Sequence, residues 1–133
     1  RQRLHGVRVL VVDDEPAVAS LLAEILEQAG ADARTEGDAS RALDGLIADP
    51  PDAVIWDLTM AGIPGDALVA DLARRAPQLV SRVVFASGDL LATASERAAG
   101  KRPVLLKPFD LAGVLRTVAA VVGGGAAPQA GAP

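Results

Sequence analysis

Three acidic residues, Asp13, Asp14 and Glu15, directly follow the apolar run VLVV at residues 9–12. Two like charges held about 4 Å apart repel by about 4 kcal/mol at an effective dielectric constant near 20, so a fixed cluster of acids needs a positive partner. A hard divalent cation is such a partner, because Mg²⁺ binds one or two carboxylates and keeps several water molecules. These acids therefore indicate a cation site, with Mg²⁺ as the expected ion.

Three further polar side chains follow apolar runs later in the chain. Asp57 comes after AVIW, Ser87 ends the run VVFAS, and Lys107 follows VLL. A carboxylate, a hydroxyl and a lysine beside a metal ion suit the attack of the carboxylate on a phosphoryl group, whose charge the cations neutralise. Asp57 is the expected nucleophile because it stands alone, whereas Asp13 and Asp14 form a pair suited to metal binding. The expected product is an aspartyl phosphate.

Five rounds of a short apolar run followed by helical spacing must position these side chains. The runs predict strands at residues 8–12, 33–35, 53–56, 82–86 and 104–106. The spacings predict helices around residues 18–26, 39–47, 68–73, 92–99 and 111–118. Strict alternation of strands and helices predicts a doubly wound α/β fold, a parallel sheet with helices on both faces. We expect the first and third strands to be neighbours, and ligands to bind beyond the carboxyl ends of the strands.

The composition restricts the class of protein. The chain has 133 residues, half of them hydrophobic, which suits one domain with one core. The net charge is -4 and no basic stripe occurs, so no nucleic-acid contact is expected. The absence of cysteine excludes disulfides and thiolate metal sites, and no apolar run approaches the roughly 20 residues that span a bilayer. We expect a soluble, cytoplasmic domain that makes no membrane contact.

The ends of the chain differ from its middle. The first residue is Arg1 rather than Met, which suggests a piece of a longer polypeptide. Residues 1–6 are expected to be a linker. The last stretch, GGGAAPQAGAP at residues 123–133, lacks periodicity and an apolar face, so we expect a disordered tail.

Four motifs, VLVVDDEP, DLTMAGIPG, FASGD and LLKPF, occur in this order and at characteristic spacings. Together they resemble the receiver domain of two-component response regulators over residues 7–122. The resemblance implies a flavodoxin-like fold, with a five-stranded sheet of order 2-1-3-4-5 and five helices. It also implies that Asp57 is the phosphoacceptor, Ser87 the switch hydroxyl and Lys107 the lysine that pairs with the phosphoryl group.

The same resemblance implies the metal site, the partners and the context. Mg²⁺ would be bound by Asp14, Asp57 and the backbone carbonyl of Thr59, with Asp13 contributing through water. The phosphodonor would be a histidine kinase or a histidine phosphotransfer domain, a second receiver is a candidate dimer partner, and phosphotransfer and dephosphorylation would be self-catalysed. The stretches SGDLL and RPVLLKPFDL are similar to receivers at the C-terminal end of hybrid sensor histidine kinases, so a kinase is the expected parent chain.

Three positions are expected to modulate the signal. Val104, three residues before Lys107, stands where many receivers have Tyr or Phe, so signalling by rotation of an aromatic ring is not expected here. Thr59 and Asp89 stand two residues past the phosphoacceptor and two past the switch hydroxyl, positions on which phosphate lifetime depends in this family.

Simpler explanations exist for single motifs. Asp14, Glu15 and Pro16 suit the start of a helix, and Ser87 followed by Gly88 suits a turn. Besides a phosphoacceptor receiver, the chain could be a receiver-fold interaction module that phosphorylation does not regulate. The missing aromatic residue at Val104 favours this alternative. A small hydrolase or nucleotide-binding domain is disfavoured, because neither G-x-G-x-x-G after the first strand nor G-x-x-x-x-G-K-[ST] occurs. The four motifs in order favour the phosphoacceptor.

Overall fold

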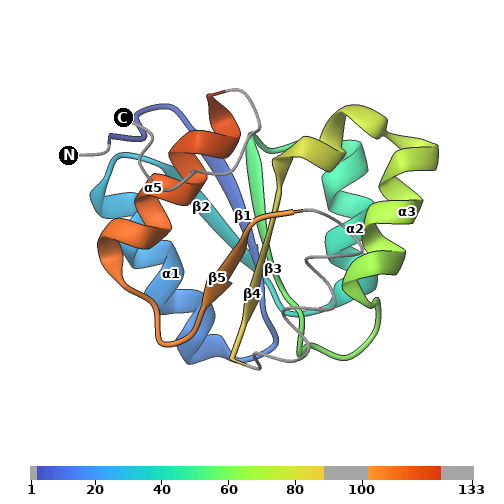
Figure 1. Ribbon diagram of the computed structural model, residues 1–133, viewed down its shortest axis with the longest axis horizontal. Coiled ribbons are helices and arrows are strands. Elements are labelled where there is room, and N and C mark those ends of the chain that lie inside the picture. Colours follow the sequence, from blue (N-terminus) through green and yellow to red (C-terminus); the bar gives the residue numbers. More distant parts are fainter. Residues whose placement is uncertain (1–2, 89–101, 124–133) are drawn as a thin grey trace.

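The computed structural model describes residues 3–88 and 102–123 and has a five-stranded parallel sheet at its centre (Figure 1). The strand order is β2-β1-β3-β4-β5, so the expected doubly wound α/β fold is confirmed. Each expected strand agrees with the observed one to within one residue at each end. The observed strands are β1 (Arg8–Val12), β2 (Asp32–Glu36), β3 (Ala53–Asp57), β4 (Val83–Ser87) and β5 (Val104–Leu106).

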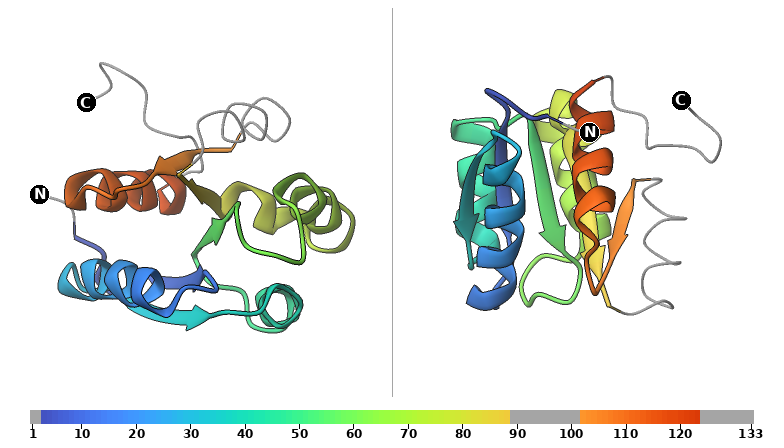
Figure 2. Two further views of the ribbon diagram at one scale, coloured as in Figure 1. Left: turned by 90° about the horizontal axis from the view of Figure 1, so that it is seen from below. Right: turned by 90° about the vertical axis from the view of Figure 1, so that its left-hand side faces the viewer.

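Helices cover both faces of the sheet (Figure 2). Helices α1 (Pro16–Gln28) and α5 (Leu111–Val122) pack on one face. Helices α2 (Ala39–Ala48) and α3 (Gly65–Arg75) pack on the other, and a 3-10 helix η1 (Pro77–Arg82) leads into β4. The sequence pattern did not predict η1, and the helix expected at residues 92–99 lies outside the described residues.

The position of each strand in the sheet explains its burial. Every residue of β3 and β4 is buried, because both strands have a neighbour on each side and helices on both faces. Strand β2 pairs only with β1 at the edge of the sheet, and its residues are exposed or half-buried. In the part of the chain that the structure describes, no helix is both long enough and apolar enough to cross a bilayer.

The N-terminal segment corrects one expectation. The sequence predicts a linker at residues 1–6, but Leu4 is only 2% exposed and belongs to the core between the sheet, α1 and α5. Its N–H donates to the carbonyl of Ala29 at 2.8 Å, and its own carbonyl accepts from Val7. Leu4 therefore belongs to the packed domain. The expected tail falls, beyond Gly123, outside the residues that the structure describes.

Candidate functional site

The carboxyl ends of four strands bring the predicted residues to one edge of the sheet. Asp13 directly follows β1 and Asp57 ends β3, and these two strands are neighbours. Ser87 ends β4, and Lys107 directly follows β5. Because all these strands are parallel, their last residues meet at the same edge, where ligands bind in such sheets.

The three aspartates form one acidic cluster. Asp13, Asp14 and Asp57 each offer a carboxylate oxygen, and these oxygens lie within 4.8 Å of one another. The side chains of Asp13 and Asp57 are buried, whereas Asp14 is exposed to solvent. The predicted acids are therefore close enough to share one cation, and one of them is open to water.

Each oxygen of the Asp57 carboxylate has its own partner. Oδ1 accepts two hydrogen bonds from Thr59, from the backbone N–H at 2.9 Å and from the side-chain hydroxyl at 2.8 Å. Oδ2 lies 3.5 Å from Nζ of Lys107. The two donors fix the carboxylate, and the lysine faces the oxygen that they leave open.

The carboxylate of Asp13 has fewer hydrogen-bond partners than that of Asp57. Its Oδ1 accepts the N–H of Glu15 at 2.9 Å, while its Oδ2 is buried without a hydrogen-bond partner among the described residues, 3.7 Å from Nζ of Lys107. Burial raises the pKa of Asp13 and the charge of Asp57 adds to this effect, although the Glu15 N–H and Lys107 oppose it. A buried carboxylate oxygen without a partner is costly, and a nearby cation or a water bound to it would satisfy this oxygen.

Helix capping does not account for the acids that follow β1. Helix α1 begins at Pro16 after Glu15, and no side-chain hydrogen bond caps this end of the helix. By contrast, Asp38 caps α2 and Asp110 caps α5 through their side chains. The simpler explanation as a helix start therefore leaves the acidic cluster unexplained.

The strand ends next to the cluster place Ser87 and Lys107. Ser87 is fully buried, and its carbonyl accepts the backbone N–H of Lys107 at 2.9 Å. The Lys107–Pro108 peptide bond is cis. The side chain of Lys107 passes beside Gly88, where an added Cβ would lie 3.8 Å from the lysine Cβ. These contacts hold the lysine against the carboxylates.

Of the three modulating positions, the structure describes Thr59 and Val104. Val104 is half-buried and lies in register with Phe85, which in turn neighbours Trp56. Phe85 and Trp56 are fully buried, so the large aromatic side chains of this row lie on the central strands rather than at position 104. Asp89 lies outside the described residues.

Sequence reasoning missed the role of the Thr59 side chain. It expected the Thr59 backbone carbonyl at the metal site but did not expect the hydroxyl to bind Asp57. A signal was present, since a hydroxyl residue close to a strand-ending aspartate often takes part in local turn hydrogen bonds.

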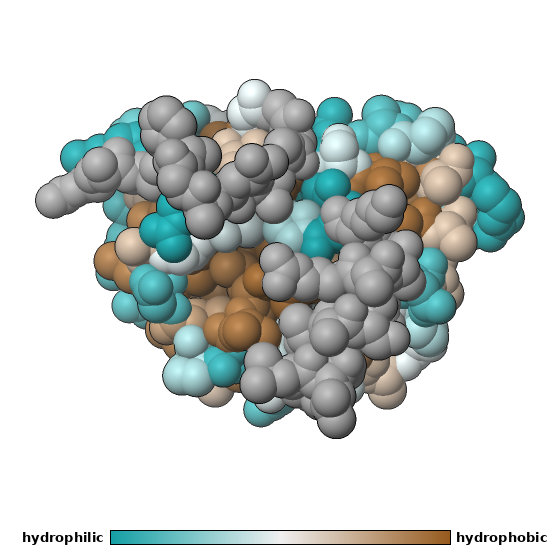
Figure 3. All heavy atoms as spheres, in the orientation of Figure 1, coloured by the Kyte–Doolittle hydropathy of each residue, from teal (hydrophilic) through white to brown (hydrophobic). Residues whose placement is uncertain are grey.

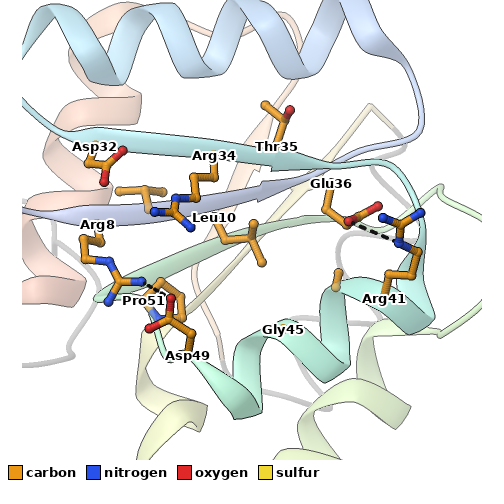
Figure 4. A pocket seen from close by; sticks show the side chains of 12 residues that line it. Arg8, Leu10, Asp32, Arg34, Thr35, Glu36, Arg41, Gly45, Asp49 and Pro51 are labelled. Atoms are coloured by element: carbon orange, nitrogen blue, oxygen red, sulfur yellow. Dashed lines mark hydrogen bonds and ion pairs between the residues drawn. The ribbon is translucent and has the colours of Figure 1, made fainter.

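A groove of about 260 Å³ lies apart from the acidic cluster, between the edge of the sheet and α2 (Figure 4). Its charged residues are largely paired. Arg8 binds Asp49 at 2.8 Å, and Arg41 lies 3.8 Å from Glu36. Among the predicted site residues that the structure describes, none lines this groove.

The chain resembles known proteins along most of its length. The sequence profile of the response regulator receiver domain matches residues 9–119. The transcriptional regulatory protein TcrA of Mycobacterium tuberculosis is 33% identical over 109 residues, which cover 82% of this chain and 43% of TcrA. The crystal structure of NtrX from Brucella abortus superimposes with a TM-score of 0.77 at 29% identity, over 88% of this chain and 27% of NtrX.

A third comparison concerns the fold alone. The receiver domain of a Francisella response regulator superimposes with a TM-score of 0.76 at 22% identity, over 89% of this chain and 98% of that domain. The chain thus matches a whole receiver domain but spans less than half of TcrA and of NtrX. Because the family profile matches residues 9–119, the chain belongs to the family of response regulator receiver domains.

Proposed function

We propose that this receiver accepts a phosphoryl group from a phosphohistidine onto Asp57, within a two-component phosphorelay. One observation carries the proposal: the buried Asp57 carboxylate is held through Oδ1 while its Oδ2 lies 3.5 Å from Nζ of Lys107. Membership of the receiver family supports it, because receiver domains interact with histidine kinases or phosphotransfer proteins. Here the kinase or phosphotransfer domain is the proposed partner.

In the proposed reaction, Oδ2 of Asp57 attacks the phosphorus atom of the phosphohistidine. A new O–P bond forms, the N–P bond breaks, and the departing histidine nitrogen keeps the electron pair. Lys107 neutralises the negative charge that gathers on the transferring phosphoryl oxygens, and the hydroxyl of Ser87 donates to one of them. Water can later cleave the same O–P bond, which returns the free carboxylate.

The acidic cluster fits Mg²⁺, a hard cation that prefers oxygen ligands. Two observations support this assignment: the buried Asp13 Oδ2 has no hydrogen-bond partner among the described residues, and Asp14 is exposed. Asp14, Asp57 and the backbone carbonyl of Thr59 would hold the ion, with Asp13 acting through water. When bound, Mg²⁺ supplies positive charge to the phosphoryl oxygens.

Exposed apolar side chains are candidates for partner contact. The face in Figure 3 has an apolar area over the α5 and β5 side, and the large apolar side chains exposed among the described residues are Leu21, Leu106, Leu111 and Val122. Leu21 lies on α1, the helix that follows the acidic cluster, so we propose that the phosphodonor domain docks near it. The hybrid-kinase context remains a prediction, since TcrA is a transcriptional regulator.

The absence of an aromatic residue at Val104 supports a second candidate function. Without an aromatic ring at this position, the fold could serve as an interaction module that phosphorylation does not regulate. In the favoured function, the phosphoryl group adds about two negative charges beside Ser87 and Lys107 and draws both residues toward Asp57. The two functions differ in whether Asp57 is modified at all.

The test is phosphoryl transfer from acetyl phosphate, followed by intact mass. The wild-type chain should gain the mass of one phosphoryl group in the presence of Mg²⁺, and little when Mg²⁺ is chelated. Asp57→Asn should gain nothing, whereas Asp44→Asn, which changes an exposed aspartate on α2, should behave as wild type. A wild-type chain that gains no mass with Mg²⁺ present would move the interaction module to first place.

A further inference from the structure

We propose that the hydroxyl of Thr59 competes with Mg²⁺ for Oδ1 of Asp57, so that Thr59 sets the affinity of the acidic cluster for the ion. The hydroxyl is a positioning group that acts through the Asp57 carboxylate. This inference rests on the proposed Mg²⁺-dependent function and assigns to one side chain the control of its metal dependence.

The two oxygens of the Asp57 carboxylate have different partners. Oδ2 lies beside Nζ of Lys107, at 3.5 Å, and is therefore the oxygen presented to a phosphoryl group. Oδ1 is the oxygen left for the ion, but it already accepts two hydrogen bonds, at 2.9 and 2.8 Å, both from Thr59. A carboxylate oxygen has about two lone-pair positions, so a cation at Oδ1 must displace one of these donors.

The two Thr59 donors differ in how firmly the structure holds them. The backbone N–H of Thr59 is fixed by its neighbours: the N–H of Leu58 donates to Ala86 at 2.9 Å, and the N–H of Met60 donates to the carbonyl of Asp57 at 3.3 Å. Met60 is also buried in the core. The Thr59 hydroxyl, in contrast, belongs to an exposed residue and can turn about one side-chain bond toward water. The hydroxyl is thus the donor that leaves at the lower cost.

Loss of the Thr59 hydroxyl should raise the affinity of the acidic cluster for Mg²⁺. Removing the hydroxyl leaves Oδ1 with one donor fewer in the metal-free protein and leaves the metal-bound protein almost unchanged. The free-energy difference should therefore favour metal binding. Because Thr59 is exposed and water partly replaces its hydroxyl, we expect affinity to rise about five-fold, which corresponds to about 1 kcal/mol.

The experiment is a titration of the isotope-labelled chain with Mg²⁺, followed through the amide resonances of residues 57–60 and of Lys107 by NMR. Thr59→Val keeps the branched shape and removes the hydroxyl, and it should bind Mg²⁺ about five-fold more tightly than wild type. Thr59→Ser restores a hydroxyl and should bind more weakly than the valine variant. Thr35→Val removes the hydroxyl of an exposed threonine on β2 that is not one of the predicted site residues, and this variant should match wild type.

Two results would overturn the inference, and they are distinguishable. If Thr59→Val binds Mg²⁺ as wild type does, or more weakly, the hydroxyl does not compete with the ion, while the proposed metal site survives. If the wild-type resonances do not shift with Mg²⁺, the metal site itself is wrong and this inference falls with it. The amide spectra also show directly whether each variant is folded.

Discussion

At the scale of single residues, burial of the Asp13 carboxylate is unfavourable for the stability of the metal-free protein. Its side chain is only 3% exposed, and one of its oxygens has no hydrogen-bond partner in the part of the chain that the structure describes. Burial raises its pKa, so in the folded chain the charged form is disfavoured. Because the folded pKa lies above the unfolded one, the penalty is fully present above the folded pKa and is relieved as the pH falls through it.

Asp13→Asn should therefore stabilise the metal-free protein. The amide carries no charge, so the variant should be more stable to unfolding by about 1 kcal/mol at neutral pH in a chelating buffer. Added Mg²⁺ should stabilise the wild-type chain, because an ion at the proposed site would favour the folded state, and should stabilise the variant less. Urea unfolding with and without Mg²⁺ checks both parts. A variant that is less stable than wild type in chelator would contradict this account of Asp13.

Lys107→Met should impair phosphoryl transfer more than stability. Nζ of Lys107 lies within 4 Å of both buried aspartates, and it faces Oδ2 of Asp57, the oxygen proposed to attack the phosphoryl group. Loss of one such group from a catalytic site commonly slows a reaction on the order of 100-fold. The rate of mass gain from acetyl phosphate measures this loss, and circular dichroism controls for folding. Transfer at the wild-type rate would remove Lys107 from the proposed reaction.

At the scale of elements, the helices begin in different ways. The Asp38 side chain caps α2 by accepting the N–H of Arg41 at 2.9 Å. Helix α1 has Glu15 at the same position without a side-chain hydrogen bond to the helix. The acidic residues before α1 can therefore take part in the acidic cluster, whereas Asp38 stabilises the start of α2.

Asp38→Ala should lower the free energy of unfolding by about 1 kcal/mol, because a backbone N–H of α2 loses its acceptor. Glu15→Ala, at the equivalent position of α1, should change stability by less than about half of that amount. Thermal or urea unfolding of the two variants in parallel makes the comparison. Equal losses would show that the caps do not differ as the hydrogen bonds indicate.

The same scale shows why some elements were predictable. Strands β3 and β4 are buried on both faces, so their sequences are continuous apolar runs. Strand β2 is an edge strand with the sequence DARTE, which carries a weak signal because much of it is exposed. The 3-10 helix η1 was not predicted, since six residues that contain Pro77, Gln78 and Ser81 show no repeating apolar face.

At the scale of the whole molecule, two cores lie on opposite faces of the sheet, and Leu4 joins one of them. Leu4→Ala should destabilise the chain by about 2–5 kcal/mol, because it leaves a cavity in a closely packed core. Leu21→Ala is the matched control, since Leu21 is 50% exposed and should lose less than about 1 kcal/mol. Urea unfolding of both variants checks this. Similar losses would mean that Leu4 is not a core residue.

Most of the site, but not all of the packing, could be predicted from the sequence. Asp13, Asp57, Ser87 and Lys107 stand at strand ends, and parallel pairing alone brings them together. The burial of Leu4 could not be predicted, because one apolar residue beside His5 and Gly6 has no periodicity. A hydrogen bond also joins Leu4 to Ala29, which is distant in the sequence.

The most direct test of the central claim is to locate the phosphoryl group. The chain is treated with acetyl phosphate and Mg²⁺, the acyl phosphate is reduced with borohydride, and the peptides are sequenced by mass spectrometry. The reduced product of an aspartyl phosphate is homoserine, and the account predicts it at position 57 and not at the neighbouring acids of the cluster. Homoserine at position 13 or 14, or a chain without any homoserine, would contradict the claim that Asp57 is the phosphoacceptor.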